Sequence, residues 1–392
     1  MAGTSSTVEI LPDRLYMHLS DDDIGPVLPH TTYLNVSPDV LVYINYFDDF
    51  GPLHLGHTFR FCAVLSDQLT AAKTAHVQLH VLVSSTDIHA QVNMVCLLAC
   101  WGVLYNRQAP ESAVQPFRHM NLPSFHDATD EACPFQVAVV DVVRGFHRAL
   151  SLQYTCRQSF NVADYLHYEK VEHGDLNWIS PKFVAFAGPQ DVATPDATTH
   201  PPGFFIPMFM KANVTLVVRL NEALYDPSPF RSAGIAHLDL GFPDGANPPS
   251  AILRRFLAAC EATPGAVAVH CKAGLGRTGT VIGCYMIKHD GFKAKDAIGW
   301  LRLCRPGSVI GEQQDYMLDM ERKMIKAAAP RHVVRTTRTT PQKRSLSMAA
   351  DASREVKNQG DRLLVAKRRH IKDRANATAS EAAHIVQTMS SR

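Results

Sequence analysis

The chain has 392 residues, 46% hydrophobic and 19% charged, which is the composition of a soluble globular protein. This length exceeds one ordinary core, so we expect about two domains with accessory sequence. The net charge of +2 is unevenly distributed, because residues 331–392 hold 14 Lys or Arg against 5 Asp or Glu, and residues 1–330 hold 25 against 32. Nine cysteines without a CxxC pair argue against a disulfide framework and fit a reducing compartment.

The first half of the chain is predicted to form an α/β domain over residues 1–189. Its start lacks a basic stretch followed by an apolar core, so we expect no secretory signal. The β-branched run Val77–Ser84 predicts a buried strand. The apolar run from Val92 to Tyr105, about 14 residues long, is shorter than the roughly 20 residues that span a bilayer. It therefore predicts a buried helix and no membrane span.

A second domain is predicted over residues 206–328, after a linker at 190–205 that is rich in Pro, Thr and Asp. It opens with a strand at Val214–Leu220, and a second strand, GAVAVH, ends at His270. Helices are expected in TVIGCYMIKHD, KAKDAIGWLRLC and EQQDYMLDMERKMIKAAA. Strands alternating with helices predict an α/β fold with helices on the faces of a sheet. Both halves contain a strand, a loop and an apolar helix in the same order. They are either two copies of one unit or two unrelated strand–helix units.

The basic segment 329–392 is poor in large apolar residues, which predicts a disordered tail. Within it, Ala366–Arg374 reads AKRRHIKDR, a density of cations typical of a patch for import receptors or nucleic acid. A solvated tail without either role fits the same residues.

The segment VAVHCKAGLGRTGTVIG, Val267–Gly283, has the pattern of an anion-binding loop. Its glycines let several backbone N–H groups point at one spot, and the start of a helix adds partial positive charge. A cysteine in such surroundings, here Cys271, is a thiolate nucleophile, and Thr278 is placed to donate a hydrogen bond to its sulfur. An arginine fork can hold two phosphate oxygens. The residues expected to cradle the phosphate are Lys272, Ala273, Gly274, Leu275, Gly276 and Arg277.

Two other interpretations of this loop fit less well. A Walker nucleotide loop would end in Gly-Lys-Ser/Thr, whereas this one ends in Gly-Arg-Thr-Gly. A buried core cysteine beside a solvated arginine would explain either residue alone but not the whole string. His270, which ends the strand, is expected to orient the loop. The corresponding loop of the first half, Val83–Asn93, contains neither Cys nor Arg, so we expect no such chemistry there.

A cysteine followed after five residues by Arg-Thr is the signature of the cysteine-dependent protein tyrosine phosphatases. Over about residues 10–328 the chain resembles the Cdc14 family of dual-specificity phosphatases. The resemblance rests on AVHCKAGLGRTGT together with CRPGSVIGEQQ (Cys304–Gln314), VVRLN (Val217–Asn221) and HYEKVEHGDLNWI (His167–Ile179). It implies two phosphatase-like domains in tandem, the first without a catalytic cysteine.

The resemblance also implies roles for residues outside the loop. Asp244, in the turn-rich segment DLGFPDGANPP, matches the general acid of the family, with Asp239 as the second choice and a turn-capping role as the alternative. Gln313 and Gln314 match the glutamines that position water, although Glu312 stands where the family usually has proline. The two-step chemistry expected of this site requires no metal and no cofactor.

The family prefers phosphoserine followed by proline, with basic residues downstream, which implies an acidic groove between the domains. Glu169, Glu172 and Asp175 match the segment that supplies it, whereas Leu166 stands where relatives carry an acidic residue. Simple solvation is the alternative for these carboxylates. We expect a phosphatase of phosphoserine-proline and phosphotyrosine sites that reverses proline-directed phosphorylation in the cell cycle, in nucleus, nucleolus and cytoplasm or at spindle structures.

Two other functions fit parts of the sequence. Phosphoinositide phosphatases also carry HCKAG, but they generally have a second lysine where Leu275 stands. A phosphoprotein-binding scaffold would typically have lost Cys271, Arg277 or Asp244, and all three are present.

Overall fold

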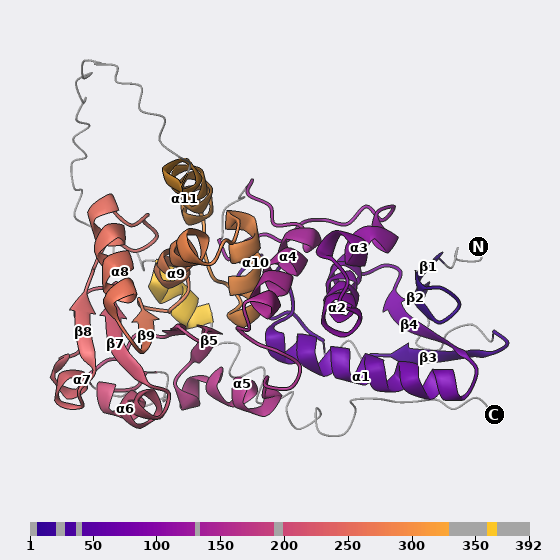
Figure 1. The fold of residues 1–392 in the computed structure, drawn as a ribbon, viewed down its shortest axis with the longest axis horizontal. Helices are drawn as coiled ribbons and strands as arrows, with labels where there is room; N and C mark the ends of the chain where they lie inside the picture. Colours follow the sequence, from indigo (N-terminus) through magenta and orange to yellow (C-terminus); the bar gives the residue numbers. More distant parts are fainter. Residues whose placement is uncertain are drawn as a thin grey trace, which may run out of the picture.

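The computed structural model describes residues 6–20, 28–36, 41–129, 134–191, 199–328 and 359–366. They form two α/β units, each built on its own sheet, which lie side by side along the long axis of the molecule (Figure 1). The predicted α/β fold with two tandem units is confirmed.

The first unit is organised around a four-stranded sheet in the order β1-β2-β4-β3. β1 is antiparallel to β2, whereas β2 and β3 run parallel to β4. β4 is buried on both faces, as its largely apolar sequence predicts for an inner parallel strand. The strands are β1 (Ser6–Leu11), β2 (Leu15–Ser20), β3 (Thr31–Asn35) and β4 (Gln78–Ser84).

The longest apolar helix of the first unit, α2, follows β4 directly. By length and composition alone it would suit a membrane span, yet every residue from 91 to 103 is buried inside the unit. It is therefore the core helix that the sequence predicted. The helices up to the second sheet are α1 (Leu55–Thr74), α2 (Ile88–Asn106), α3 (Pro110–Val114), η1 (Gln115–Phe117), α4 (Val139–Ser151), α5 (Val162–Tyr168) and η2 (Val171–His173).

The second unit has a five-stranded sheet in the order β5-β6-β9-β7-β8, in which β5 is antiparallel to β6 and the other pairs are parallel. Its strands are β5 (Leu176–Ser180), β6 (Phe183–Phe186), β7 (Val214–Arg219), β8 (Ala236–Asp239) and β9 (Ala266–His270). Its helices are α6 (Pro202–Lys211), α7 (Ser228–Ser232), α8 (Ser250–Ala262), α9 (Gly276–His289), α10 (Ala294–Cys304) and α11 (Glu312–Ala328).

The central strand β9 is covered on both faces because successive side chains point to opposite sides. Val267 and Val269 belong to the core that includes residues of α8, α9 and α10, whereas Ala266 and Ala268 belong to a second core with residues of α6 and α7. The carboxyl end of β9 is where ligands reach such a sheet. Cys271 follows directly at that end.

The second sheet begins earlier in the chain than the predicted domain boundary near residue 190. β5 and β6 lie within the predicted first domain, yet β6 pairs in parallel with β9. The reason is that β6 is a short, fully buried strand whose partner lies some 80 residues further along the chain, and periodicity identifies such a strand without naming its partner. The predicted linker at 190–205 therefore lies inside the second unit, and its residues 192–198 are outside the described residues.

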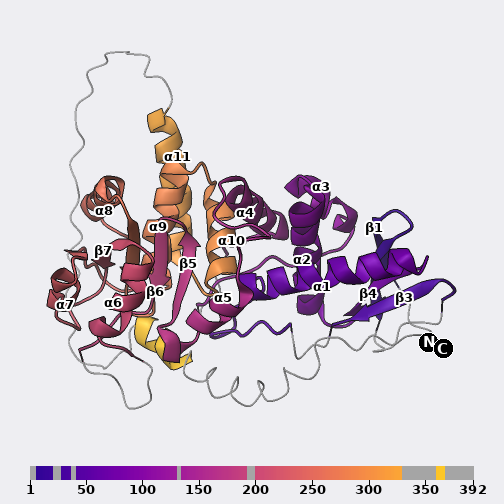
Figure 2. The ribbon, with the colours of Figure 1, turned by 60° about the horizontal axis from the view of Figure 1, so that its bottom comes forward.

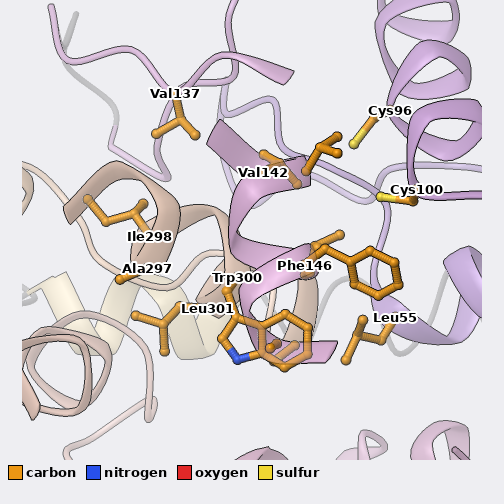
Figure 3. Close-up of a cluster of buried hydrophobic side chains, with 14 of the residues drawn as sticks. Leu55, Cys96, Cys100, Val137, Val142, Phe146, Ala297, Ile298, Trp300 and Leu301 are labelled. Atoms are coloured by element: carbon orange, nitrogen blue, oxygen red, sulfur yellow. The ribbon is translucent and has the colours of Figure 1, made fainter. Parts of the chain in front are cut away.

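The two units share one hydrophobic core through α4 and α10. Two glycines bring these helices close together, since a Cβ on Gly145 would lie 2.2 Å from the carbonyl oxygen of Asp296, and one on Gly299 would lie 2.7 Å from Val142 Cα. Figure 3 shows side chains of both helices, among them Trp300, interleaved at this junction. Trp300 Nε1 donates to Ile179 O at 2.9 Å, which ties α10 to β5.

Candidate active site

The loop between β9 and α9 is held through its carbonyl oxygens. His270 Nδ1 lies 2.9 Å from Cys271 O, and Gly188 N donates to Lys272 O at 2.9 Å. Gly274 has a φ of 69°, and a Cβ there would lie 2.1 Å from a backbone oxygen, so no other residue fits without strain. Carbonyls turned away from the loop leave the intervening amides facing its interior, which is the arrangement that binds anions.

Arg305 holds the next two carbonyls of the loop. Its Nη2 donates to Ala273 O at 2.9 Å and its Nε to Gly274 O at 2.8 Å. Its Nη1 donates to Asn177 Oδ1 at 2.7 Å and lies 2.8 Å from Asp175 Oδ1. Arg305 is 1% exposed, so this is a buried ion pair that fixes the loop to the segment before β5. Arg305 lies in the motif CRPGSVIGEQQ, but nothing in that motif indicated a role for it.

Cys271 opens this loop directly after β9, and Arg277 lies in the first turn of α9, at the other end of the loop. Cys271, Arg277 and Thr278 are at most 3% exposed. Arg277 Nε and Thr278 Oγ1 have no hydrogen-bond partner within the described part of the chain. Buried donors are normally satisfied, so these two indicate a site built for an anion at the start of α9.

The loop after β8 brings Asp244 to this site. Asp244 Oδ1 lies 3.0 Å from Arg277 Nη2, and Arg277 Nη1 donates to Phe242 O at 2.9 Å on the same loop. Asp239, the second choice for the acid, instead accepts from Arg219 Nε at 2.6 Å at the end of β8. The structure therefore favours Asp244 as the carboxyl group beside the arginine.

The two glutamines are placed differently. Gln313 is fully buried, donates through Nε2 to Ala246 O at 3.2 Å, and lies where a Cβ on Gly276 would be 2.8 Å from its Oε1. It therefore contacts both the acid loop and the start of α9. Gln314 instead accepts from Arg302 Nη2 at 2.7 Å. Gln313 remains the candidate for positioning water, whereas the amide oxygen of Gln314 is used to hold α11 against α10.

A helix at residues 359–366, within the predicted disordered tail, packs on the site (yellow in Figure 2). Gly360 N donates to Asp244 Oδ2, and Asp361 forms an ion pair with Lys272 Nζ. Leu363 is 3% exposed in a cluster that includes Leu275. The apolar run LLV was the available signal, but nothing in the sequence identified its partner. The prediction of a disordered tail is therefore wrong for residues 359–366, and the rest of the predicted tail, 329–358 and 367–392, lies outside the described residues.

The three predicted groove carboxylates do not form one surface. Asp175 is 2% exposed and paired with Arg305, so the predicted groove role is wrong for this residue: its carboxylate is used inside the fold. Glu169 Oε2 lies 3.8 Å from His54 Nε2 and its side chain is 11% exposed, while Glu172 is exposed. A groove role for Glu169 and Glu172 stays a prediction.

The corresponding loop of the first unit is closed by its own side chains. Asp87 Oδ1 accepts from the amides of His89 and Ala90 at 2.9 and 3.0 Å, so a carboxylate caps the N-terminus of α2. Gln91 Nε2 donates to Ser84 O and Ser85 O. The carboxylate of Asp87 therefore lies where a phosphate would have to bind. This loop is unsuited to phosphate binding for that reason, as well as for its lack of Cys and Arg.

The fold and this arrangement define a class of protein. A cysteine after a central parallel strand, an arginine in the first turn of the next helix and an aspartate on a neighbouring loop constitute the site of a cysteine-dependent phosphatase. Residues 9–149 match the family described as "Dual specificity protein phosphatase, N-terminal half", and residues 250–323 match "Dual specificity phosphatase, catalytic domain".

Similar proteins narrow the class to one family. "Dual specificity protein phosphatase CDC14AB" of Danio rerio is 41% identical over 315 residues, which cover 79% of this chain and 51% of that protein. "Dual specificity protein phosphatase CDC14A" of Homo sapiens is 39% identical over 315 residues, covering 79% and 52%. "Tyrosine-protein phosphatase CDC14" of Saccharomyces cerevisiae is 36% identical over 334 residues, covering 80% and 58%. The chain belongs to the Cdc14 family of dual-specificity phosphatases. It spans 51% to 58% of the length of these three relatives.

Proposed function

We propose that this chain is a protein phosphatase that hydrolyses phosphoserine and phosphotyrosine through a phosphocysteine. The observation that carries the proposal is that Cys271, Arg277 and Thr278 are all buried, and that Arg277 Nε and Thr278 Oγ1 have no partner among the described residues and are free to donate to the oxygens of a phosphate. Family membership supports the same reaction.

The first step transfers the phosphoryl group to the cysteine. The Cys271 thiolate attacks phosphorus in line, the bond from phosphorus to the leaving oxygen breaks, and protonated Asp244 gives its proton to that oxygen. Arg277 and the loop amides hold the equatorial oxygens, where charge is spread in the transition state. In the structure the Asp244 carboxylate is paired with Arg277. When a phosphate binds to the Arg277 guanidinium, it replaces this carboxylate, and Asp244 turns towards the leaving oxygen.

The second step returns the thiolate. A water molecule attacks phosphorus, the Asp244 carboxylate accepts its proton, and the sulfur–phosphorus bond breaks. Thr278 Oγ1 donates a hydrogen bond to the departing sulfur, and the Gln313 amide is close enough to the start of α9 to orient the water. Over the two steps one water molecule is consumed, phosphate is released, and Cys271 and Asp244 return to their starting states.

The proposed substrates are phosphoserine-proline sites with basic residues downstream, of the kind that proline-directed kinases make in the cell cycle. Exposed Glu172 supports an acidic subsite for those basic residues, with Glu169, whose side chain is 11% exposed, as its second carboxylate. A nuclear or nucleolar location, with cytoplasm and spindle structures as further sites, rests on the basic segment around 366–374, which lies outside the described residues beyond Ala366.

The proposed function is tested by substitution and by a peptide panel. Cys271→Ser should abolish turnover and leave a protein that still binds a phosphopeptide, and retained turnover would refute the assignment. Phosphopeptides that vary the residue after phosphoserine and the charge two or three places on should show a preference for proline and lysine or arginine. Equal rates across the panel would leave the reaction standing and remove the specificity.

The alternative of a phosphoinositide phosphatase is disfavoured by Leu275. This residue is fully buried in the cluster with Leu363, so the loop position at which lipid-directed relatives present a lysine is apolar and inside the protein here. Phosphate release from phosphoinositides that rivals release from phosphoserine-proline peptides would favour the alternative.

A further inference from the structure

A buried chain of side chains connects the catalytic loop to β8. Tyr225 Oη lies 2.8 Å from His270 Nε2 and 2.7 Å from His237 Nε2. At the other end, His270 Nδ1 lies 2.9 Å from Cys271 O. Tyr225 is 4% exposed, and the side chains of both histidines are fully buried. None of these hydrogen bonds takes part in the proposed phosphoryl transfer itself.

The chemistry of the atoms fixes the direction of every hydrogen bond in this chain. The carbonyl of Cys271 can only accept, so His270 Nδ1 carries a hydrogen. Burial lowers the pKa of His270 to about 3, so the ring is neutral near pH 7 and its Nε2 can only accept. Tyr225 therefore donates to His270, and its oxygen must accept from His237 Nε2–H. Each hydrogen bond in the chain is therefore donated in the same direction, from His237 on β8 towards the carbonyl of Cys271.

The surroundings of His237 keep it a neutral donor. Its Nδ1 is 3.7 Å from Asp239 Oδ2, beyond hydrogen-bond distance, and has no partner among the described residues. Asp239 is taken by Arg219 Nε at 2.6 Å, and burial lowers the pKa of His237 to about 4. Arg219 Nη1 also donates to Tyr225 O at 2.7 Å, and its guanidinium lies over the Tyr225 ring at 4.6 Å. Arg231 is a further positive charge that acts on His237.

We infer that Tyr225 and His237 are positioning residues for phosphoryl transfer, which hold His270 in its Nδ1–H form and thereby fix the carbonyl of Cys271. The first carbonyl of the loop then stays turned away from the phosphate, as Gly188 and Arg305 turn the next three. This inference rests on the proposed chemistry at Cys271. Without a donor at Nε2, the ring can carry its hydrogen there instead, and the carbonyl loses its partner.

The direct test reads the tautomer by ¹⁵N NMR of the full chain with labelled histidine, in a Cys271→Ser background that does not turn over. The His270 signals among the 19 histidines are assigned by their loss in His270→Gln. We expect a protonated Nδ1 and an unprotonated Nε2 for His270, and a protonated Nε2 for His237, unchanged from about pH 5 to about pH 8. An Nε2–H form or an imidazolium at His270 would overturn the inference, whatever the enzyme's activity.

Variants with an intact Cys271 test the consequence. Tyr225→Phe and His237→Leu should mix the His270 tautomers and lower kcat about 10-fold with little change in KM, because the loop is pre-organised less well for the transition state. His237→Gln, which keeps an N–H donor, should recover most of the rate. The matched control is Tyr154→Phe, which removes a hydroxyl facing Asp290 and should change neither quantity. Wild-type tautomers and kcat in Tyr225→Phe would refute the inference.

Discussion

The structure makes its sharpest prediction at Arg305, which joins the catalytic loop to the buried Asp175. Arg305→Met keeps much of the apolar stem and removes the guanidinium that bonds to Ala273 O, Gly274 O and Asn177 Oδ1. It also leaves the Asp175 carboxylate, which is 2% exposed, without its positive partner. Breaking a buried ion pair from one side costs about 3–5 kcal/mol. We expect the free energy of unfolding to fall by about that amount.

The catalytic effect follows from the two loop carbonyls. Once they are released, the amides between them no longer converge on the phosphate, and losing one such pre-organised donor lowers kcat by about 10² to 10³. We expect a loss of about 10² in kcat for an aryl phosphate. Urea unfolding followed by tryptophan fluorescence, and phosphate release by the protein that remains folded, measure the two effects separately.

A second substitution and a control make this test specific. Asp175 has a φ of 48°, which asparagine tolerates, so Arg305→Met with Asp175→Asn removes the unpaired charge without backbone strain. This double variant should recover part of the stability and none of the kcat. Arg302→Met, three residues earlier in α10, removes a buried arginine that bonds to Ser308 O, Val309 O and Gln314 Oε1 instead of to the loop, and should lower stability more than kcat. A kcat within threefold of wild type in Arg305→Met would refute the reasoning.

Three further predictions concern single groups. Asp244→Asn should lower kcat by about 10² to 10⁴. The loss should be larger for an alkyl than for an aryl phosphate, because an alkoxide is a more basic leaving group and depends more on protonation. An equal loss for both would contradict the role of acid. Burial and the neighbouring Asp141 raise the pKa of Asp296 to about 7. The native state then binds more protons than the unfolded state, so the free energy of unfolding falls as pH rises from about 4 to about 7. Asp296→Asn should therefore raise the urea midpoint more at pH 8 than at pH 5, and an equal gain at both would contradict this. Leu363→Asp should detach the helix at 359–366, seen as lost amide-exchange protection at Gly360, with the midpoint of global unfolding unchanged; retained protection would show that the apolar contact is not what holds it.

The parts of the site that the sequence revealed are those encoded locally. Cys271, Arg277 and Thr278 lie within eight consecutive residues whose glycines and flanking apolar runs specify a strand, a loop and a helix. Asp244 was found through the family motif around it, and its carboxylate lies 3.0 Å from Arg277 Nη2 in the structure. The relative positions of the three loop residues can be predicted because the short chain between them can adopt few conformations.

The parts that the sequence missed depend on contacts between distant segments. Arg305 and Asp175 are 130 positions apart, and nothing in either segment distinguishes a buried partner from a solvated charge. The same limit explains why Asp175 was assigned to a surface groove and why β5 and β6 were placed in the first domain. The helix at 359–366 is the extreme case, because Gly360 and Asp244 lie 116 positions apart.

The two halves of the chain show how a small local change decides whether this fold can bind phosphate. In both units an inner parallel strand leads through a short loop into a buried helix. In the first, Asp87 caps the helix with a carboxylate, a contact that stabilises a helix by about 1 kcal/mol. In the second, the residue at the same place is Leu275, which makes no side-chain cap. The catalytic unit thus keeps its first-turn amides without a side-chain acceptor, which is less stable for the helix alone and is the condition for an anion to bind there.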